Sequence, residues 1–243
     1  MSQLRAYAHA VDLAASGSRA ALPQSRPRRK RLGVDARRAE LIELGFELFR
    51  THAYDTLSVE QIAIHAQISK GLLYHYFQSK REYYLQVVCA LADEFVVMAR
   101  THIRVGNMEG LEAGVDAFLD YARSRRGLIE GLMRGAFGTA DEVSKIVELT
   151  RREIVSNLLA DLGECTPSVR NALRGWVQFS ERTVLAWIDH EEVGKPELRR
   201  LLIATVAHAI NVARSAAAAH GGVPRRELQA GARAALTSLV GSA

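Results

Sequence analysis

Apolar residues recur at helical spacing along most of the chain. After Asp35, the residues Ala39, Ile42, Phe46 and Phe49 follow one another at steps of three and four residues, the period of one face of an α-helix. Asp35 is expected to be the N-cap of this helix. Runs that alternate between apolar and polar residues are scarce, so the pattern predicts an all-α fold. Comparable stripes predict further helices at 81–104, 108–125, 127–137, 141–162, 167–190, 196–219 and 224–240.

Between the first two long helices the pattern changes to two short helices joined by a tight turn. Ser58 and Gln61 stand three residues apart, the spacing of a capping box, in which each side chain bonds to the backbone amide of the other residue. They predict a short helix that ends near Ala66. Ser69 is expected to cap a second short helix. Two helices joined in this way form the helix-turn-helix motif, whose second helix lies in the major groove of DNA.

The second short helix has a composition suited to reading DNA. Residues 69–77 read Ser-Lys-Gly-Leu-Leu-Tyr-His-Tyr-Phe, which combines a lysine with several aromatic side chains. A two-helix unit of this size buries too little apolar area to stay folded alone. The helix after Asp35 is therefore expected to support it, in a three-helix domain at 35–80, with Leu73 and Phe77 in its core.

The net positive charge is concentrated around this domain. The chain has a formal charge of +5; residues 24–84 contain 11 Lys and Arg against 7 Asp and Glu, whereas residues 85–243 contain 19 of each. A local excess of positive charge is the electrostatic pattern expected of a surface that binds phosphates.

The first 34 residues form a separate region. Residues 23–31 combine two prolines with a dense run of basic side chains, a composition that does not pack into a core. We expect residues 1–34 to be a flexible, basic N-terminal arm. It is either a solvated tail or an arm that follows the DNA backbone or enters the adjacent minor groove.

Motifs of several other protein classes are missing from the sequence. There is no H-E-x-x-H zinc motif, no C-x-x-C pair, no phosphate-binding G-K-[ST] loop and no G-x-S-x-G nucleophile motif. The protein is therefore expected not to be an enzyme, and neither a cofactor nor a metal is predicted. Cys89 and Cys165 are expected to be reduced core residues. Without an apolar stretch of 18 residues or a secretory signal, the predicted location is cytoplasmic.

The helix-turn-helix region contains a set of motif residues between Leu41 and Leu85. They are Phe49, Tyr54, Ser58-Val59, Ile62-Ala63, Ser69-Lys70-Gly71, Leu73-Tyr74-His75-Tyr76-Phe77 and Ser79-Lys80. Through these residues the region resembles the DNA-binding domain of the TetR family of transcriptional regulators. The resemblance implies an all-helical homodimer, in which the domain at 35–80 binds an operator and a larger domain at 81–243 binds an effector and dimerises.

The resemblance also implies which residues contact DNA. Lys70, Gly71 and Leu72 open the second short helix and would meet base edges, because lysine donates to guanine and glycine lets the backbone approach closely. The aromatic residues after them would contact phosphates or thymine methyl groups, although for Tyr76 a place in the core is equally supported. The predicted DNA-binding residues are Ser58, Ser69, Lys70, Gly71, Leu72, Tyr74, His75, Tyr76 and Lys80.

The sequence departs from the family pattern within this region. Gln67 occupies the turn position where glycine is common, so either the glutamine adopts a positive φ or the turn differs. Leu72 stands where threonine is frequent, which favours apolar contact with a thymine methyl group over a hydrogen bond. Ala53 replaces a frequent glycine.

Two predicted helices, at 167–190 and 196–219, have apolar faces wide enough to need a partner. The resemblance implies that they form a four-helix bundle across the axis of a homodimer. The alternative is that both helices pack within one chain.

The effector site is expected among the C-terminal helices. Glycines recur at nearly four-residue spacing from Gly127 to Gly138, either for close helix packing or as an adaptable wall for a ligand. His208, alternatively a core histidine, is one of the candidate contacts. Their apolar and aromatic character suggests a small hydrophobic effector. The candidate ligand-binding residues are Met133, Phe137, Trp176, Phe179 and His208.

The predicted function is that of a sequence-specific DNA-binding transcriptional regulator, most simply a repressor that a small hydrophobic ligand releases from a palindromic operator. The alternative is a helix-turn-helix regulator without a small-molecule effector, which a protein partner controls or which activates transcription. Release by a ligand would require a shift of the long helix that follows Lys80, and this shift would change the distance between the two reading helices of a dimer.

Overall fold

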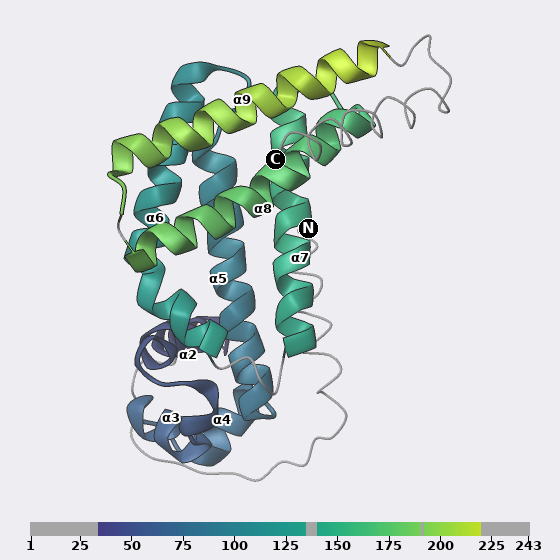
Figure 1. Cartoon of the computed structure of the whole chain (residues 1–243). Helices are drawn as coiled ribbons and strands as arrows, with labels where there is room; N and C mark the ends of the chain where they lie inside the picture. Colours follow the sequence, from purple (N-terminus) through teal and green to yellow (C-terminus); the bar gives the residue numbers. More distant parts are fainter. Residues whose placement is uncertain (1–33, 135–139, 191, 220–243) are drawn as a thin grey trace, which may run out of the picture.

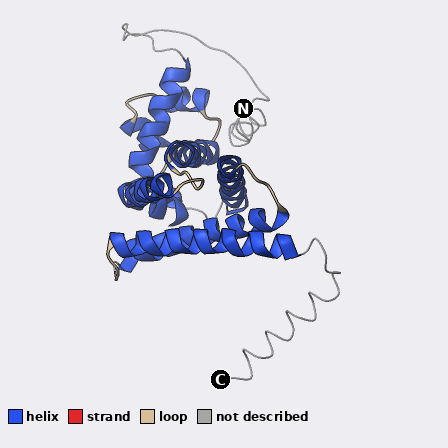
Figure 2. Ribbon diagram, turned by 90° about the horizontal axis from the view of Figure 1, so that it is seen from above, coloured by secondary structure: helices blue, strands red, loops and turns tan. Residues whose placement is uncertain are grey.

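The computed structural model describes residues 34–134, 140–190 and 192–219, and all regular structure in these ranges is helical (Figures 1 and 2). The predicted all-α class is therefore confirmed. With the helices labelled as in Figure 1, the elements are α2 (Val34–Thr51), the 3-10 helix η1 (Tyr54–Thr56), α3 (Val59–His65), α4 (Lys70–Tyr76), α5 (Lys80–His102), α6 (Met108–Arg134), α7 (Ala140–Leu162), α8 (Pro167–His190) and α9 (Lys195–Ala219).

The three helices α2, α3 and α4 gather at one end of the molecule, and α5 runs from them into the larger C-terminal part (Figure 1). There α5 lies beside α6 and α7, while α8 and α9 cross these three helices. Seen from above, α8 and α9 form one long edge of the molecule (Figure 2). A domain with a helix-turn-helix is thus followed by a larger helical domain, as predicted.

The helix boundaries differ from the predicted ones in two places. The helices predicted at 108–125 and 127–137 are one continuous helix, α6, up to Arg134. A Cβ atom at Gly127 would lie 3.0 Å from Cγ of Arg50, so this glycine allows α6 to pack closely on α2 without interrupting the helix. Asp35 is not the N-cap, because α2 already begins at Val34 and Asp35 lies in its first turn, where its carboxylate still favours the helix dipole. The helix predicted at 224–240 lies outside the described residues.

The core of the N-terminal domain is built from aromatic residues. Tyr83 and Tyr84, at the start of α5, are almost completely buried and pack against Phe49 of α2 with ring centroids 6.0 and 5.1 Å apart. The Tyr83 hydroxyl donates a hydrogen bond of 2.7 Å to the Leu41 carbonyl. Because each buried aromatic ring removes a large apolar area from water, this cluster holds α2 and α5 together.

The C-terminal part is held together by a buried tryptophan and by ion pairs between helices. Trp176 of α8 donates from Nε1 to the Leu202 carbonyl of α9 at 3.0 Å, so its buried indole has a satisfied polar group. At the start of α9, Arg199 pairs with Asp116 of α6 at 2.6 Å. Cys89 is buried, as predicted, but the prediction for Cys165 is wrong, because this residue is exposed. Cys165 lies in the short link between α7 and α8, where it has too few neighbours to be covered.

Helix α9 is the one described helix that is long and apolar enough, by length and composition, to cross a membrane. Only 22% of its apolar 18-residue stretch is buried within the protein. Such a helix gives weak evidence for a membrane span, because core and interface helices have the same composition. Its exposed residues Leu201, Ala204, His208 and Val212 recur at steps of three and four. They therefore form a single stripe along α9 that is largely apolar.

The contact between α2 and α5 leads to a prediction about stability. A Cβ atom at Gly45 would lie 2.4 Å from Cγ2 of Val87 and 2.9 Å from the Tyr83 hydroxyl, so Gly45→Ala overpacks a rigid core. Alanine ordinarily favours a helix by about 0.5–1 kcal/mol over glycine, but overpacking costs about 1–3 kcal/mol. We expect a lower free energy of unfolding, measured by urea denaturation at one protein concentration.

Gly175→Ala is the matched control. No atom lies within 4 Å of a Cβ placed at Gly175, so this change should stabilise the protein by about 0.5–1 kcal/mol through helix propensity alone. Equal stabilisation by both substitutions would show that α2 and α5 are not in close contact.

Candidate nucleic-acid interface

The first helix of the helix-turn-helix begins with the predicted capping box. The Ser58 hydroxyl accepts a hydrogen bond from the Gln61 amide at 3.1 Å, and the Gln61 side chain accepts one from the Ser58 amide at 2.7 Å. These reciprocal bonds satisfy backbone groups that have no partner inside the helix. The inner face of α3 is covered, with Ile62 and Ala63 buried.

The turn and the start of α4 also follow the sequence pattern. Ser69 is the N-cap of α4, and its hydroxyl accepts a hydrogen bond from the Leu72 amide at 3.1 Å. Gln67 adopts a φ of 52°, so of the two alternatives the glutamine takes the left-handed conformation. This conformation is unfavourable for a residue with a side chain, and it allows α3 and α4 to meet at the angle of the motif.

Helix α4 presents one face to solvent and the other to the core. Leu73 and Phe77 are buried, as predicted, whereas Leu72 and Tyr74 expose 39% and 41% of their surface. Gly71 is also exposed, and a Cβ there would meet only the Ser69 hydroxyl, at 4.0 Å. An exposed face with this mixture of small, apolar and hydroxyl groups is suited to close contact with base edges and thymine methyl groups.

Tyr76 and His75 lie at the end of this face. Tyr76 is only partly buried and packs against the core, and its ring meets the exposed His75 ring edge-on at 5.4 Å. The structure therefore gives Tyr76 a mixed environment, between the two alternatives of core and surface.

The lysine that opens α4 already has a partner within the chain. The Lys70 ammonium forms an ion pair with Glu60 of α3 and lies 5.9 Å from the centre of the Tyr74 ring. The hydrogen bond from Lys70 holds the pKa of the Glu60 carboxyl below its usual range and raises the pKa of Lys70. Both side chains are about half exposed, so the pair is open to exchange with a phosphate or a base.

Lys80, at the start of α5, is also engaged within the protein. Its ammonium donates to the Tyr54 carbonyl at 3.0 Å and lies 4.3 Å from the centre of the Tyr54 ring. The lysine therefore ties α5 to η1 in the free protein. Contact of Lys80 with DNA stays a prediction, in which a phosphate would compete with the Tyr54 carbonyl.

The contacts that hold α4 in place involve two residues that the sequence pattern did not single out. Arg38 of α2 donates to the Tyr76 carbonyl at 2.8 Å and stacks 4.7 Å above the Phe77 ring. Its guanidinium also lies 3.8 Å from the buried carboxylate of Glu82, which accepts the Gln78 amide at 2.7 Å. No local pattern reveals such a pair, because Arg38 and Tyr76 are 38 residues apart.

An exposed apolar residue on α3 was likewise not predicted. Ile64 exposes 72% of its surface although neighbouring residues of the same helix are buried. The sequence signal that could have predicted the exposure of Ile64 is its position one turn after Glu60, on the outward face of the helix.

Comparison with known proteins identifies the family. Residues 41–87 match the model of the bacterial regulatory proteins of the TetR family, and residues 107–209 match the model of a tetracyclin repressor-like C-terminal domain. The chain belongs to the TetR family of transcriptional regulators. It is thus a DNA-binding protein, and α4 is the second helix of its helix-turn-helix domain, the position that the reading helix has in this motif.

Relatives of this TetR-family chain include an activator. The helix-turn-helix transcriptional activator FasR of Mycolicibacterium smegmatis is 36% identical over 96 residues, which are 39% of this chain and 44% of FasR. The match therefore spans less than half of that protein.

Solved structures share the fold. A TetR-family regulator from Streptomyces coelicolor has a TM-score of 0.66 and 23% identity, with 86% of this chain and 100% of that chain covered. The fatty acid degradation regulator FadR from Bacillus halodurans has a TM-score of 0.57 and 16% identity, with 73% and 96% covered.

The predicted effector contacts do not gather around one visible site. Trp176 is buried between α8 and α9, whereas Phe179 and His208 are exposed on the outside of these helices. Met133 lies in α6, but the position of its side chain is not described, and Phe137 lies outside the described residues. Among the described residues there is no group of three His, Cys, Asp or Glu side chains that could hold a metal ion.

The ion pair of Lys70 yields a prediction about operator affinity. In Glu60→Gln the lysine keeps a hydrogen-bond partner but loses the charge that holds it, and a carboxylate near the DNA is removed. Operator affinity at low salt should rise roughly threefold, and the gain should shrink as salt is added. Fluorescence anisotropy with labelled operator DNA measures the affinity at several salt concentrations. Glu148→Gln, the same change at an exposed position of α7, should leave operator affinity unchanged. Equal affinities for E60Q and wild type would contradict the competition between Glu60 and DNA for Lys70.

Arg38 yields a second prediction, about positioning. Arg38→Gln should lower the free energy of unfolding by about 1–3 kcal/mol, because it removes a hydrogen bond and the charge partner of buried Glu82. Arg50→Gln, which breaks an exposed pair with Glu47 on the same helix, should cost less than about 0.5 kcal/mol.

The double variant Arg38→Gln with Glu82→Gln separates folding from positioning. It should recover stability in urea denaturation, since no buried charge is left, but not operator affinity, since the Tyr76 end of α4 stays without its anchor. Recovery of both quantities would mean that Arg38 serves stability alone.

Proposed function

We propose that the protein is a homodimeric regulator that represses transcription from a palindromic operator until a small hydrophobic ligand releases it. The observation that carries this proposal is the pair of helices that link the reading helix to the C-terminal domain. A change in the C-terminal helices is transmitted to α4 only if such a link is rigid. The link through α5 is packed and hydrogen-bonded, and the link between α6 and α2 is closely packed.

The first link is α5. It is one continuous helix from Lys80 to His102, and every residue from Glu82 to Cys89 is buried. Its first turn is bonded to the helix-turn-helix domain through Lys80 and Tyr83. A shift of the C-terminal part of α5 would therefore move the reading helix as well.

The second link is the contact of α6 with α2. Arg125 of α6 lies 5.5 Å above the Phe46 ring of α2 and pairs with Glu94 of α5 at 2.5 Å. Two residues further along α6, Gly127 lies against Arg50 of α2. Since α2 supports α4, a ligand that displaces the end of α6 would change the orientation of the reading helix. Met133 and Phe137 follow this contact along the chain, and we keep them as proposed ligand contacts.

The exposed apolar stripe of α9 supports the homodimer. Leu201 and Val212 expose 45% and 52% of their surface, and Phe179 of the neighbouring α8 exposes 40%. A second copy of the chain related by a two-fold axis would cover these residues and His208. Two reading helices related by the same axis would then read the two halves of a palindrome.

The second candidate function is that of an activator. It is favoured by the similarity to FasR, which is a transcriptional activator. DNA binding and dimerisation are the same in both candidates, and the position of the operator relative to the promoter would decide between them.

Selection of bound DNA from a random pool tests the core of the proposal. The full chain should enrich a palindrome, because a symmetric dimer presents two identical reading helices. Lys70→Gln should relax the selection at one base pair of each half-site. It should also reduce the free energy of operator binding by about 1–3 kcal/mol. Lys145→Gln, which removes an exposed charge from α7, should leave the selected site unchanged. A selected site without two-fold symmetry would count against the dimer.

A reporter gene behind the selected operator separates the two candidates. Removing the regulator should raise transcription if it is a repressor and lower it if it is an activator. A screen of small hydrophobic compounds by thermal shift should yield a ligand that raises the melting temperature and weakens operator binding by about 5-fold to 150-fold. A stabilising ligand that leaves operator affinity unchanged would reject ligand release.

A further inference from the structure

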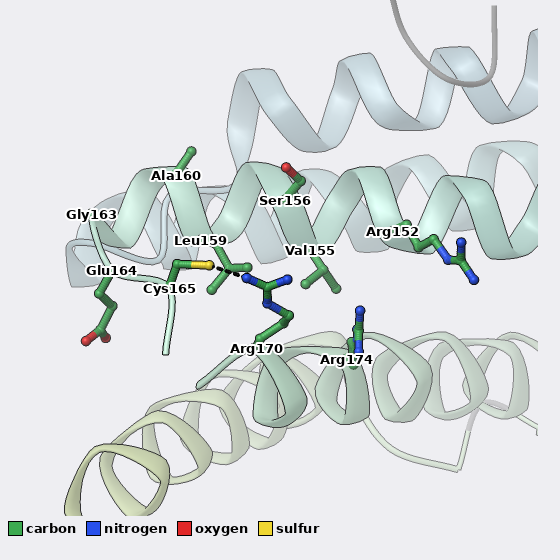
Figure 3. Close-up of a pocket in the computed structure, with 10 residues that line it drawn as sticks. All are labelled: Arg152, Val155, Ser156, Leu159, Ala160, Gly163, Glu164, Cys165, Arg170 and Arg174. Atoms are coloured by element: carbon green, nitrogen blue, oxygen red, sulfur yellow. Dashed lines mark hydrogen bonds between the residues drawn. The ribbon is translucent and has the colours of Figure 1, made fainter. Parts of the chain in front are cut away.

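A cavity of about 410 Å³ lies between the C-terminal half of α7 and the first turns of α8 (Figure 3). One part of its lining is apolar, formed by Val155, Leu159 and Ala160 of α7. The other part is basic: Arg152 extends from α7, and Arg170 and Arg174 extend from α8. None of the residues proposed above as DNA or effector contacts lines this cavity.

The two arginines of α8 carry charge that the described part of the chain does not neutralise. Arg170 and Arg174 are one helical turn apart and both extend into the gap between the helices (Figure 3), an arrangement in which like charges repel each other. Arg170 donates only to the sulfur of Cys165, at 2.6 Å, and a thiol is a weak acceptor. Arg174 has no hydrogen bond or ion pair with any residue in the described ranges.

Other charged groups nearby are paired in the ordinary way. Arg151, on the same helix as the apolar lining, forms two hydrogen bonds of 2.8 Å with Glu181 of α8. Arg152 pairs with Glu148 at 2.9 Å. Glu164 is the one carboxylate among the lining residues, and Arg214 of α9 pairs with it at 2.7 Å. The contact between α7 and α8 thus supplies carboxylates elsewhere but none to Arg170 and Arg174.

We propose that this cavity binds a small amphipathic anion, a carboxylate or phosphate monoester with a short apolar part. The anionic group would lie between Arg170 and Arg174, because guanidinium groups bind carboxylate and phosphate oxygens through paired, charge-assisted hydrogen bonds. The apolar part would lie on Val155 and Leu159. The volume is within the range of small-molecule sites. This site is separate from the hydrophobic effector site proposed above and does not rest on it.

Cys165 provides a direct readout of occupancy. The chain has two cysteines, and Cys89 is buried. Burial raises the pKa of the Cys89 thiol to about 12, so at neutral pH it is neither exposed nor ionised. Alkylation by iodoacetamide therefore reports on Cys165, whose sulfur lies at the edge of the cavity beside Arg170 (Figure 3).

Calorimetry with octanoate, octyl phosphate and octanol tests the proposal on the full chain without DNA. Octanoate or octyl phosphate should bind saturably and slow the alkylation of Cys165. Octanol and inorganic phosphate, which each lack one half of the ligand, should bind about tenfold more weakly or worse. The stronger of the two anions identifies the head group. The proposal would be overturned if octanol bound as tightly as octanoate and octyl phosphate. It would also be overturned if inorganic phosphate bound as tightly as these two anions.

Matched variants link the binding to the two arginines. Arg174→Gln should weaken the binding of the preferred anion about tenfold or more, while the melting temperature without ligand should fall little, because Arg174 has no described partner to lose. Arg182→Gln removes the same charge from an exposed position on α8 outside the cavity and should not change the affinity. Equal affinities of wild type and Arg174→Gln would reject the site, whatever the outcome of the operator experiments.

Discussion

The reading helix depends on the burial of Tyr83 and Tyr84 at the start of α5. Their rings pack on Phe49 of α2, and the Tyr83 ring also meets Phe77 edge-on at 4.9 Å. Phe77 directly follows α4 in the chain, so the position of the tyrosines determines where α4 ends. Each of these rings exposes 1% of its surface or less. A cluster packed this tightly has little freedom to rearrange, and α2, α4 and α5 are therefore held in one orientation.

The same cluster makes α5 a mechanical connection as well as a core element. Burial around α5 and the contact of α6 with α2 join these two helices to the helix-turn-helix domain, as the proposed release by a ligand requires. Polar contacts refine the orientation that the aromatic core sets: Arg38 holds the Tyr76 carbonyl, and Lys80 holds the Tyr54 carbonyl. Because these contacts join backbone carbonyls to side chains of other helices, they fix the ends of elements, where backbone groups lack partners.

The basic residues at the two proposed binding sites differ in their physical state. Lys70 and Lys80, which the family resemblance places at the DNA, have partners in the free protein, a carboxylate and a carbonyl. The predicted contacts with DNA would require an exchange of these partners, which would reduce the net gain from each phosphate or base. Arg170 and Arg174 stand in contrast, because the described chain offers them no carboxylate. Sequence alone shows both groups simply as positive charge, since the partners come from other helices.

The sequence by itself determined the helical class, the helix-turn-helix and its caps at Ser58 and Ser69. These features depend on contacts between residues three or four positions apart, so the pattern of side chains is sufficient to predict them. Only the tertiary structure decided that α6 is continuous, that Cys165 is exposed and that Arg38 anchors the reading helix. These outcomes depend on which helices meet and at what distance, and a local pattern carries no information about residues that are 38 positions apart.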